Sequence, residues 1–342
     1  MAIRGYRVMQ SWLAVLAFWF SVTCLSAGEV TVERDLATGW EVYTLRQGET
    51  TVHVAPGAGA NAYSVVHCGT EFFRVPEELR KLPGVRYGNP ILYPMPNRVK
   101  GATFTFEGKT YEFPKNHAGN FIHGLVHSEE FDVESTVAKD DFVEMTCSLK
   151  FDPGRRPYEL FPFRHVFRMT LSVHEGAVRW TYEVDNSEGE RDLPFGVAFH
   201  PYLIYQKSRK ETYLHVPTAH LMESAKQLPS GNLLELDGHP LDARQPRSLD
   251  GFNADDVFFG MMPDQPARVT FRDVNHSITF WASAEFTHLV VWTPDRPYFG
   301  IENQTCSTDA HNLVSQGKGD VAHLQICSPG EKMTGNVEYR FK

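Results

Sequence analysis

Apolar and polar residues alternate through three consecutive stretches in the middle of the chain, over residues 143–151, 163–173 and 178–184. A period of two places the apolar side chains on one face of an extended strand, whereas a helix needs apolar residues three or four apart. Stretches of this length therefore predict half-buried strands of an antiparallel sheet. Residues 174–177 (HEGA) predict the turn that joins the second stretch to the third.

Shorter strands are predicted on both sides of this region, at residues 51–54, 63–68, 268–271, 278–282, 289–292 and 337–341, with a hairpin over residues 103–113. Helical periodicity extends over about three turns at most, and residues 76–82 predict no more than a short helical turn. No internal repeat or linker divides the chain. These strands predict an all-β fold, one large β-sandwich with very little helix.

The composition of the 342-residue chain is that of an ordinary globular protein, with 42% hydrophobic and 22% charged residues. Its formal net charge of −9 argues against nucleic acid or an anionic membrane surface as a partner. The same charge disfavours a highly anionic substrate, unless a local basic pocket overrides it. Aromatic residues reach 13%, which suits a β-rich core or a cleft that binds sugars.

The first 27 residues have the pattern of a secretory signal peptide. Arg4 and Arg7 precede the apolar run of residues 12–20, and small residues follow at 26–28. The apolar run is short for a membrane span, so we expect cleavage, export and a mature protein without a stable membrane span; an uncleaved anchor is the minor alternative. Residues 28–342 are then expected to form a single domain.

Removal of the signal would leave four cysteines in the mature chain. An oxidising compartment permits disulfides among them, and buried free thiols fit the sequence equally well. The pairing therefore stays open for Cys68, Cys147, Cys306 and Cys327.

Several familiar cofactor and catalytic motifs are missing from the chain. It has no nucleophile elbow, zinc-protease motif, P-loop or calcium loop, and its fifteen histidines lack metal-ligand spacing. Gly57, Gly59 and Ala62 match a dinucleotide-binding fingerprint loosely, but a strand follows them where that fingerprint requires a helix. We therefore expect neither a cofactor nor a metal.

One imidazole, His200, lies in the otherwise largely apolar segment 193–203 (LPFGVAFHPYL). Pro201 follows it directly and forbids a helix through this point, so we expect His200 where a strand ends and a loop begins. A histidine in such surroundings is either a packed core residue or a proton donor or acceptor near neutral pH.

Three prolines within residues 88–98 (GNPILYPMPNR) exclude both a helix and a central strand there. Such a segment typically lines a surface or a cleft. It ends in Asn97 and Arg98, and Arg98 has the donors either to bind a ligand hydroxyl or carboxylate or to form a structural ion pair.

Three further positions combine polar side chains with unusual local sequence, and we expect them in loops. His123 precedes a glycine, which lets another group approach the backbone closely. Asp255 and Asp256 would place a carboxylate at a pocket rim or cap a turn. Glu302 lies inside an apolar run, so it must be paired, protonated or functional.

Five segments together carry a family resemblance, in the family's order and over nearly the whole mature chain: residues 94–99 (PMPNRV), 121–125 (FIHGL), 194–202 (PFGVAFHPY), 255–258 (DDVF) and 301–304 (IENQ). In these segments the chain resembles the aldose 1-epimerases, or galactose mutarotases, and their broader relatives. A single match such as His-Gly is weak, but five in order are specific. The resemblance implies a large twisted antiparallel β-sandwich, in agreement with the strand pattern.

The resemblance also implies roles for individual residues. It places the acid that protonates the ring oxygen at His200, the catalytic base at Glu302 and a second active-site histidine at His123. It places substrate-binding groups at Asn97 and Arg98.

The substrate-binding aspartate falls on Asp255 by the same resemblance, with Asp256 as the adjacent competitor. After Glu302 the chain reads NQTC, where relatives often carry proline or tryptophan. This departure leaves the preferred sugar open more than the reaction.

The implied reaction interconverts the α and β anomers of a sugar by opening the hemiacetal. A base removes the proton of the anomeric hydroxyl, an acid protonates the ring oxygen, the C1–C2 bond rotates, and the ring closes by the reverse steps. This chemistry needs no metal or redox cofactor. We expect Glu302 to be ionised and His200 protonated in the resting enzyme, each stabilising the other's charge.

The predicted function is therefore an exported aldose 1-epimerase acting on a free hexose. A hexose-6-phosphate 1-epimerase would need additional Arg or Lys at the pocket, and a non-catalytic carbohydrate-binding protein would share the fold. A two-carboxylate glycosidase would pair Asp255 or Asp256 with Glu302 and leave the histidines without a role. An arrangement in which His200 and Glu302 face one cleft would favour the epimerase.

Overall fold

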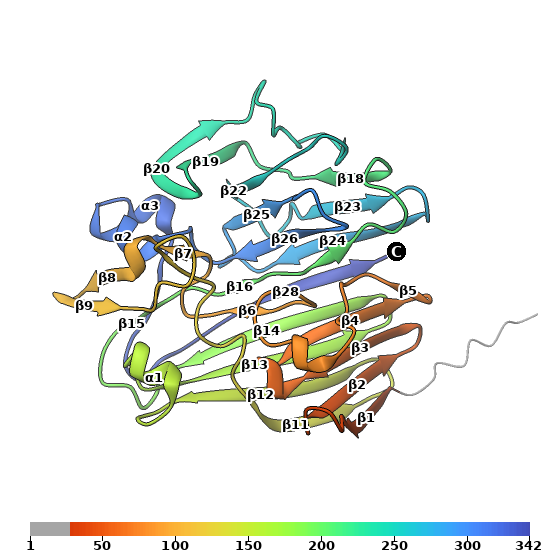
Figure 1. Cartoon of the computed structure of the whole chain (residues 1–342), viewed down its shortest axis with the longest axis horizontal. Helices are drawn as coiled ribbons and strands as arrows, with labels where there is room; N and C mark the ends of the chain where they lie inside the picture. Colours follow the sequence, from red (N-terminus) through yellow and green to blue (C-terminus); the bar gives the residue numbers. More distant parts are fainter. Residues whose placement is uncertain (1–27) are drawn as a thin grey trace, which may run out of the picture.

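The computed structural model describes residues 28–342 (Figure 1). The predicted signal peptide, with Arg4 and Arg7, lies outside the described residues. Within this range no helix is both long and apolar enough to cross a membrane.

The largest sheet has nine strands and contains the three stretches that alternate most regularly. These stretches form consecutive antiparallel hairpins, in which Val143 pairs with Val173 and Val173 with Val178. In order across the sheet, the strands are β11 (Asp132–Ala138), β12 (Val143–Phe151), β13 (His165–His174), β14 (Ala177–Asp185), β28 (Lys332–Phe341), β24 (His276–Ala282), β23 (Ala267–Phe271), β18 (Thr212–His215) and β21 (Arg247–Ser248).

A sheet of eight strands carries two of the candidate site residues, Asp255 and Glu302. Its strands are, in order, β20 (Leu228–Glu235), β19 (His220–Ala225), β22 (Asp255–Phe259), β25 (His288–Trp292), β26 (Tyr298–Gln304), β16 (Ala198–Phe199) and β6 (Ile91–Leu92), with β17 (Leu203–Ile204) also paired to β26. The strands toward the N-terminus form a third, five-stranded sheet of β1 (Glu29–Arg34), β2 (Glu41–Gln47), β3 (Thr50–Ala55), β4 (Asn61–His67) and β5 (Thr70–Glu71).

The five- and eight-stranded sheets join into one layer. Isolated bridges connect Ala62 with Asn89 and Phe73 with Leu203, at the boundary between the two sheets. This layer packs against the nine-stranded sheet, as the figure also shows for β2 and β3 over β12 and β13 (Figure 1).

Aromatic side chains fill the space between the layers. The rings of Trp180 in β14 and Phe199 in β16 lie 6.3 Å apart, and Phe271 in β23 lies 6.0 Å from Phe72 and 6.4 Å from Phe299. One continuous apolar core runs through both layers. Burial of each such side chain contributes about 1.5–3 kcal/mol to stability, and the predicted antiparallel β-sandwich is confirmed.

The helices are short and lie outside the sheets. They are α1 (Arg156–Leu160), α2 (Ala310–Ser315) and α3 (Gly319–Ala322), with single 3₁₀ turns η1 (Pro56–Ala58), η2 (Leu79–Lys81) and η3 (Lys100–Ala102). Three two-stranded ladders complete the fold: β7 (Arg98–Val99) with β10 (Phe121–Ile122), β8 (Thr103–Phe106) with β9 (Lys109–Glu112), and β15 (Leu193–Phe195) with β27 (Gln325–Cys327). The predicted helical turn at residues 76–82 and the hairpin at 103–113 are thus both present.

All four cysteines of the described chain are free thiols, and three of them are buried. Burial raises the pKa of the Cys147 and Cys306 thiols to about 12. Of the two possibilities left open by the sequence, the structure has the free thiols.

Candidate active site

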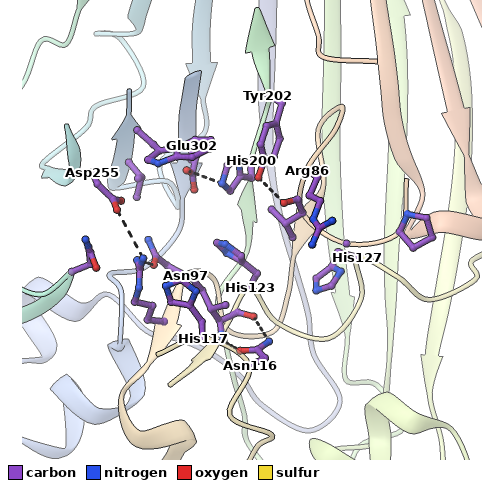
Figure 2. Close-up of a pocket in the computed structure, with 18 residues that line it drawn as sticks. Arg86, Asn97, Asn116, His117, His123, His127, His200, Tyr202, Asp255 and Glu302 are labelled. Atoms are coloured by element: carbon purple, nitrogen blue, oxygen red, sulfur yellow. Dashed lines mark hydrogen bonds and ion pairs between the residues drawn. The ribbon is translucent and has the colours of Figure 1, made fainter. Parts of the chain in front are cut away.

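A pocket of about 780 Å³ opens on the face of the eight-stranded sheet that points away from the sandwich core. This volume lies within the range typical of small-molecule sites. All six predicted site residues line it: Asn97, Arg98, His123, His200, Asp255 and Glu302. Figure 2 shows the side chains of Asn97, His123, His200, Asp255 and Glu302 converging from strands and loops that are far apart in the sequence.

Three neighbouring strands form the floor of the pocket. Strand register sets Asp255 in β22 opposite Trp292 in β25, and Trp292 opposite Gly300 in β26. Two residues along, Val290 of β25 pairs with Glu302 of β26. Side chains two residues apart on a strand share a face. The paired residues at Trp292 and at Val290 therefore lie on the same face of the sheet, and this face lines the pocket.

Asp255 and Glu302 therefore lie on strands, and the expectation that they lie in loops was wrong. Along β26, Phe299 and Ile301 point into the sandwich core, whereas Gly300 and Glu302 point to the pocket. Six of the seven residues of this strand are buried, because both of its faces are covered. A strand buried on both faces has no alternation of polar and apolar residues, so these residues carry no clear strand signal.

The same periodicity distinguishes the two adjacent aspartates. Asp255 lines the pocket, and its carboxylate Oδ2 lies 3.9 Å from Arg98 Nη2. Asp256 is the next residue on the strand, so its side chain leaves the opposite face, where Oδ2 accepts a hydrogen bond from the Asp255 backbone N–H at 3.1 Å. Of the two candidates left by the sequence, Asp255 has the position to meet a ligand.

His200 follows directly after β16, where the sequence placed it. Its backbone N–H donates to the carbonyl of Pro90 at 3.1 Å, which fixes the point where strand gives way to loop. The imidazole Nε2 lies 3.2 Å from Glu302 Oε1, and both side chains are almost fully buried while still lining the pocket. The two groups that the sequence singled out are thus direct neighbours.

Aromatic rings fix the plane of the His200 imidazole. Tyr202 stacks on it with 4.7 Å between ring centroids and 9° between ring planes, and Trp292 meets it edge-on at 5.6 Å and 74°. The Tyr202 hydroxyl donates to the carbonyl of Val85 at 2.6 Å, which holds the stacked pair against the loop at residues 83–86.

The ionisation expected for this pair is not the one that its surroundings favour. Burial lowers the pKa of His200 to about 3. Burial and, secondarily, the nearby Asp255 carboxylate raise the pKa of Glu302 well above its usual value. In the unliganded pocket both shifts favour a carboxylic acid and a neutral imidazole, in place of the expected ion pair. Both forms carry the same single proton on one hydrogen bond and differ in which atom holds it.

The β7–β10 ladder brings Asn97, Arg98 and His123 together. Arg98 pairs with Ile122, and the backbone N–H of His123 donates to the carbonyl of Asn97 at 2.8 Å. Asn97 and His123 both have left-handed backbone, with φ of 57° and 73°. Such strain is common at functional sites, and here it turns both side chains toward the pocket.

Gly124 shows why a glycine follows this histidine. A Cβ built on it would lie 2.7 Å from the Tyr93 carbonyl carbon and 2.8 Å from the Tyr93 nitrogen, and its φ is +71°. The backbone of Tyr93 occupies that space and accepts a hydrogen bond from Leu125 at 2.7 Å. The close approach predicted from the sequence is therefore an approach of the proline-rich segment.

At one end of the pocket Arg98 lies between Asn97 and Asp255. Its Nη1 donates to Asn97 Oδ1 at 2.9 Å, while Nη2 faces Asp255. Burial raises the pKa of Asp255, and the Arg98 charge partly opposes that rise. A long contact of 3.9 Å leaves both side chains with hydrogen-bonding capacity for a ligand.

His123 lies on the far side of His200 from Tyr202. The two imidazoles are nearly perpendicular, at 83°, with centroids 5.4 Å apart. Burial, and next the neighbouring His200, lower the pKa of His123 well below its usual value. Its buried Nδ1 has no hydrogen-bond partner among residues 28–342, which suits a group that completes its bonding with a ligand.

Sequence reasoning missed several residues that line this pocket. Tyr202 lies inside the recognised segment 194–202 but received no role, and Trp292 ends a predicted strand without a polar signal. Arg86, His117 and His127 also line the pocket, and nothing in their local sequence marked them. Two ordinary aromatic residues and three scattered basic ones are found only once the chain is folded.

The arrangement suits proton transfer to and from a polar molecule. One acid–base pair shares a proton at the floor, and amide, guanidinium and carboxylate groups surround it. Among residues 28–342, no three His, Cys, Asp or Glu side chains are grouped to hold a metal ion. Fold and site together suit an enzyme that works by acid–base chemistry on a β-sandwich scaffold.

Comparison with known proteins gives the particular family. The aldose 1-epimerase family model matches residues 41–340, so the chain belongs to the aldose 1-epimerase family and is an isomerase of the mutarotase type. The curated relative YihR, an uncharacterised protein of Escherichia coli K12, is 24% identical over 188 residues, and this alignment covers 54% of each chain. The chain thus matches about half the length of that relative.

Solved structures share the fold at low sequence identity. A galactose mutarotase-like protein from Clostridium acetobutylicum is 19% identical with a TM-score of 0.80, and the alignment covers 92% of this chain and 99% of that one. A galactose 1-epimerase from Lactobacillus acidophilus is 16% identical with a TM-score of 0.74, covering 93% and 99%. A putative aldose 1-epimerase from Escherichia coli K12 is 20% identical with a TM-score of 0.72, covering 89% and 99%. The predicted family and fold are both confirmed.

Proposed function

We propose that this protein interconverts the α and β anomers of a free aldose, with Glu302 as the base and His200 as the acid. The observation that carries the proposal is the 3.2 Å contact between His200 Nε2 and Glu302 Oε1 at the floor of an open pocket. A binding protein has no need of two titratable groups buried together, since their burial costs free energy.

Substrate binding moves the proton shared by the pair from Glu302 to His200. The anomeric hydroxyl donates to the Glu302 carboxylate, and this hydrogen bond favours the ionised acid. The shared proton then resides on His200 Nε2. Glu302 accepts the anomeric proton while His200 gives its proton to the ring oxygen, so the C1–O bond to the ring breaks and a carbonyl forms at C1.

Ring closure uses the same two groups in reverse. After rotation about C1–C2, His200 removes the proton from the C5 hydroxyl as this oxygen attacks the other face of the carbonyl. Glu302 returns its proton to the new anomeric oxygen. Each well-placed proton-transfer group accelerates such a step by roughly 10²–10⁴.

The remaining polar residues are proposed to hold the sugar. Arg98 and Asn97 donate to hydroxyls of the sugar, and Asp255, beside Arg98, accepts a hydrogen bond from a sugar hydroxyl. His123 offers a hydrogen bond through Nδ1, the ring nitrogen that has no partner in the described part of the chain. Trp292 provides an aromatic surface for the apolar face of the sugar.

The test is the rate of mutarotation of freshly dissolved α-D-glucose and α-D-galactose, followed by polarimetry with purified protein. Glu302→Gln and His200→Asn should each lower kcat by 10²–10⁴. Asp256→Asn, one strand residue away from the pocket-facing Asp255, is the control and should keep wild-type activity. If both pair variants retain full activity while folded, the assignment of acid and base is wrong.

We also propose that the protein is exported, on the pattern of residues 1–27. Fusion of a reporter enzyme to residues 1–40 should deliver the reporter outside the cytoplasm, and Arg4→Glu with Arg7→Glu should retain it inside. Equal distribution of the two fusions would contradict export.

A further inference from the structure

The charges lining the pocket are not evenly distributed. The two carboxylates among its lining residues, Asp255 and Glu302, both come from the floor strands. The wall formed by residues 83–86 and 116–127 presents Arg86, His117 and His127 and no carboxylate. Figure 2 shows Arg86 and His127 on the side of the pocket away from Asp255, with His200 between. The floor thus has Arg98 beside its carboxylate Asp255, whereas the wall has the guanidinium of Arg86 without a carboxylate.

The backbone at Arg86 is fixed by its neighbours. Arg74 places its guanidinium between the rings of Tyr87 and Tyr298, 4.3 and 4.4 Å from their centroids, and donates to the carbonyl of Arg86 at 3.0 Å. The preceding carbonyl, of Val85, accepts from the Tyr202 hydroxyl. Arg86 is therefore presented by a braced loop at the edge of the site.

The guanidinium of Arg86 is available to a ligand. Its side chain is exposed, and within the described range no carboxylate lies at ion-pair distance from it. The other arginine of the pocket, Arg98, instead faces Asp255. An unpaired guanidinium at a pocket wall is suited to bidentate binding of a planar anion.

His127 adds a neutral donor beside this charge. Its Nδ1 lies 2.8 Å from Ser128 Oγ, which leaves Nε2 for the pocket. The backbone of His127 packs closely against Gly59, where a Cβ would lie 2.7 Å from the His127 Cα. Burial, and next the Arg156 charge, lower the pKa of His127 to about 4. At neutral pH this imidazole is uncharged, so Arg86 supplies the full positive charge on this stretch of wall.

The reaction itself orients the substrate toward this wall. His200 protonates the ring oxygen, and that oxygen is bonded to C1 on one side and to C5 on the other. Since Glu302 holds the C1 hydroxyl, C5 and its substituent extend away from Glu302. Tyr202 stacks on one face of the His200 ring, and its hydroxyl reaches the loop that carries Arg86. Figure 2 shows Glu302 and Arg86 on opposite sides of His200.

We propose that the substrate of this site is an aldose whose C5 substituent carries a single negative charge, such as the carboxylate of a hexuronic acid, and that Arg86 binds this group. The inference rests on the proposed anomer interconversion and names its substrate class. One guanidinium with neutral donors matches a monoanion, whereas a phosphate dianion needs a further cation. The net charge of −9 does not oppose it, because binding depends on the local field of the pocket.

The test compares anomer interconversion of D-glucuronate and D-galacturonate with that of D-glucose, D-galactose and D-glucose 6-phosphate, each measured by NMR exchange at equilibrium. The wild-type enzyme should show a kcat/KM at least 10-fold higher for the uronates than for the matching neutral sugars. The Arg86→Gln variant should lose about 10–100-fold in kcat/KM for uronates, the value of one charged hydrogen-bonded contact, and change less than 3-fold for neutral sugars.

The matched control is Arg80→Gln, which removes an exposed arginine that is paired with Glu78 and does not line the pocket. It should leave every rate within 2-fold. The KM for uronates should also rise with ionic strength, while that for neutral sugars stays constant.

Each outcome has a distinct meaning. If neutral sugars are interconverted but uronates are not preferred, or if Arg86→Gln affects both classes equally, the substrate inference is wrong and the proposed reaction stands. Preference for the 6-phosphate over both uronates would overturn the monoanion assignment. If folded wild-type protein accelerates none of the five sugars above buffer, the proposed function itself fails.

Discussion

Trp292 and Gly300 are direct cross-strand partners on the pocket floor, and the missing side chain of Gly300 leaves open the space beside His200 and Glu302. A Cβ built on Gly300 would lie 3.3 Å from Glu302 Oε1, 3.4 Å from Trp292 Cε3 and 3.5 Å from His200 Cε1. The backbone of Gly300 is not left-handed, so backbone conformation does not require a glycine here. The reason for the glycine is the close approach of the site residues, which leaves no room for a side chain.

Gly300→Ala should therefore lower kcat/KM by about 10-fold with little loss of stability. The added methyl group displaces the Glu302 carboxylate or the Trp292 ring by a few tenths of an ångström, which is enough to weaken proton transfer. Mutarotation kinetics and denaturant unfolding measure the two effects. Gly319→Ala, at an ordinary φ with no atom within 4 Å of the new Cβ, is the control and should change neither quantity.

Replacing Asp255 and Asp256 one at a time tests which of the two carboxylates faces the pocket. Asp255→Asn removes the carboxylate that faces Arg98 and should raise KM by about 10–100-fold, the effect of losing a charged hydrogen-bonded contact. Because the Asp255 charge contributes to the raised pKa of Glu302, the alkaline limb of the rate profile should also move to lower pH. Asp256→Asn should do neither, and a KM effect confined to Asp256→Asn would reverse the assignment.

The pH dependence follows from the proton that the pair shares. Protonation of His200 in addition to Glu302 removes the base, and this occurs far below pH 6.5 because the pKa of His200 is lowered to about 3. Loss of the shared proton removes the acid, and this occurs well above pH 4.5 because the pKa of Glu302 is raised. A plot of kcat/KM against pH should be flat through neutrality and fall on both sides. An acid limb between pH 6 and 7 that disappears in His200→Asn would contradict it.

Alanine substitution at Gly124 and at Gly119 distinguishes the cost of a steric clash from the cost of a left-handed backbone. Both have positive φ, +71° and +83°, but a Cβ on Gly124 meets the Tyr93 backbone whereas a Cβ on Gly119 meets nothing within 4 Å. Gly119→Ala should cost about 1–2 kcal/mol, the price of a left-handed L residue. Gly124→Ala adds a backbone clash of about 1–3 kcal/mol or more and should also reduce activity, because it displaces His123.

Chemical denaturation measures the stability of these two variants, and mutarotation rates measure their activity. Equal destabilisation would show that Tyr93 moves aside without cost. A fully active Gly124→Ala protein of wild-type stability would disprove the close packing of the proline-rich segment on the His123 loop.

The prediction of the fold succeeded where one face of a strand is buried and the other is not. Strands β12, β13 and β14 show clear alternation, and their residue ranges were recognised nearly as they are. Strand β22 was missed because it is short and its first residues, Asp255 and Asp256, are both polar. Strand β26 was not recognised as a strand because both of its faces are covered, which removes the period of two.

The sequence by itself determined the all-β class, the family and the six residues of the site, since these depend on local alternation and on motifs that are contiguous in the chain. Only the tertiary structure decided that Asp255 and not Asp256 faces the cavity, that the His200–Glu302 pair is buried enough to favour its neutral form, and that Arg86 lies at the opposite wall. Strand register and burial depend on partners that are not neighbours in the chain, such as Asp255 with Trp292 and His200 with Glu302, and no local pattern encodes the distance between such groups.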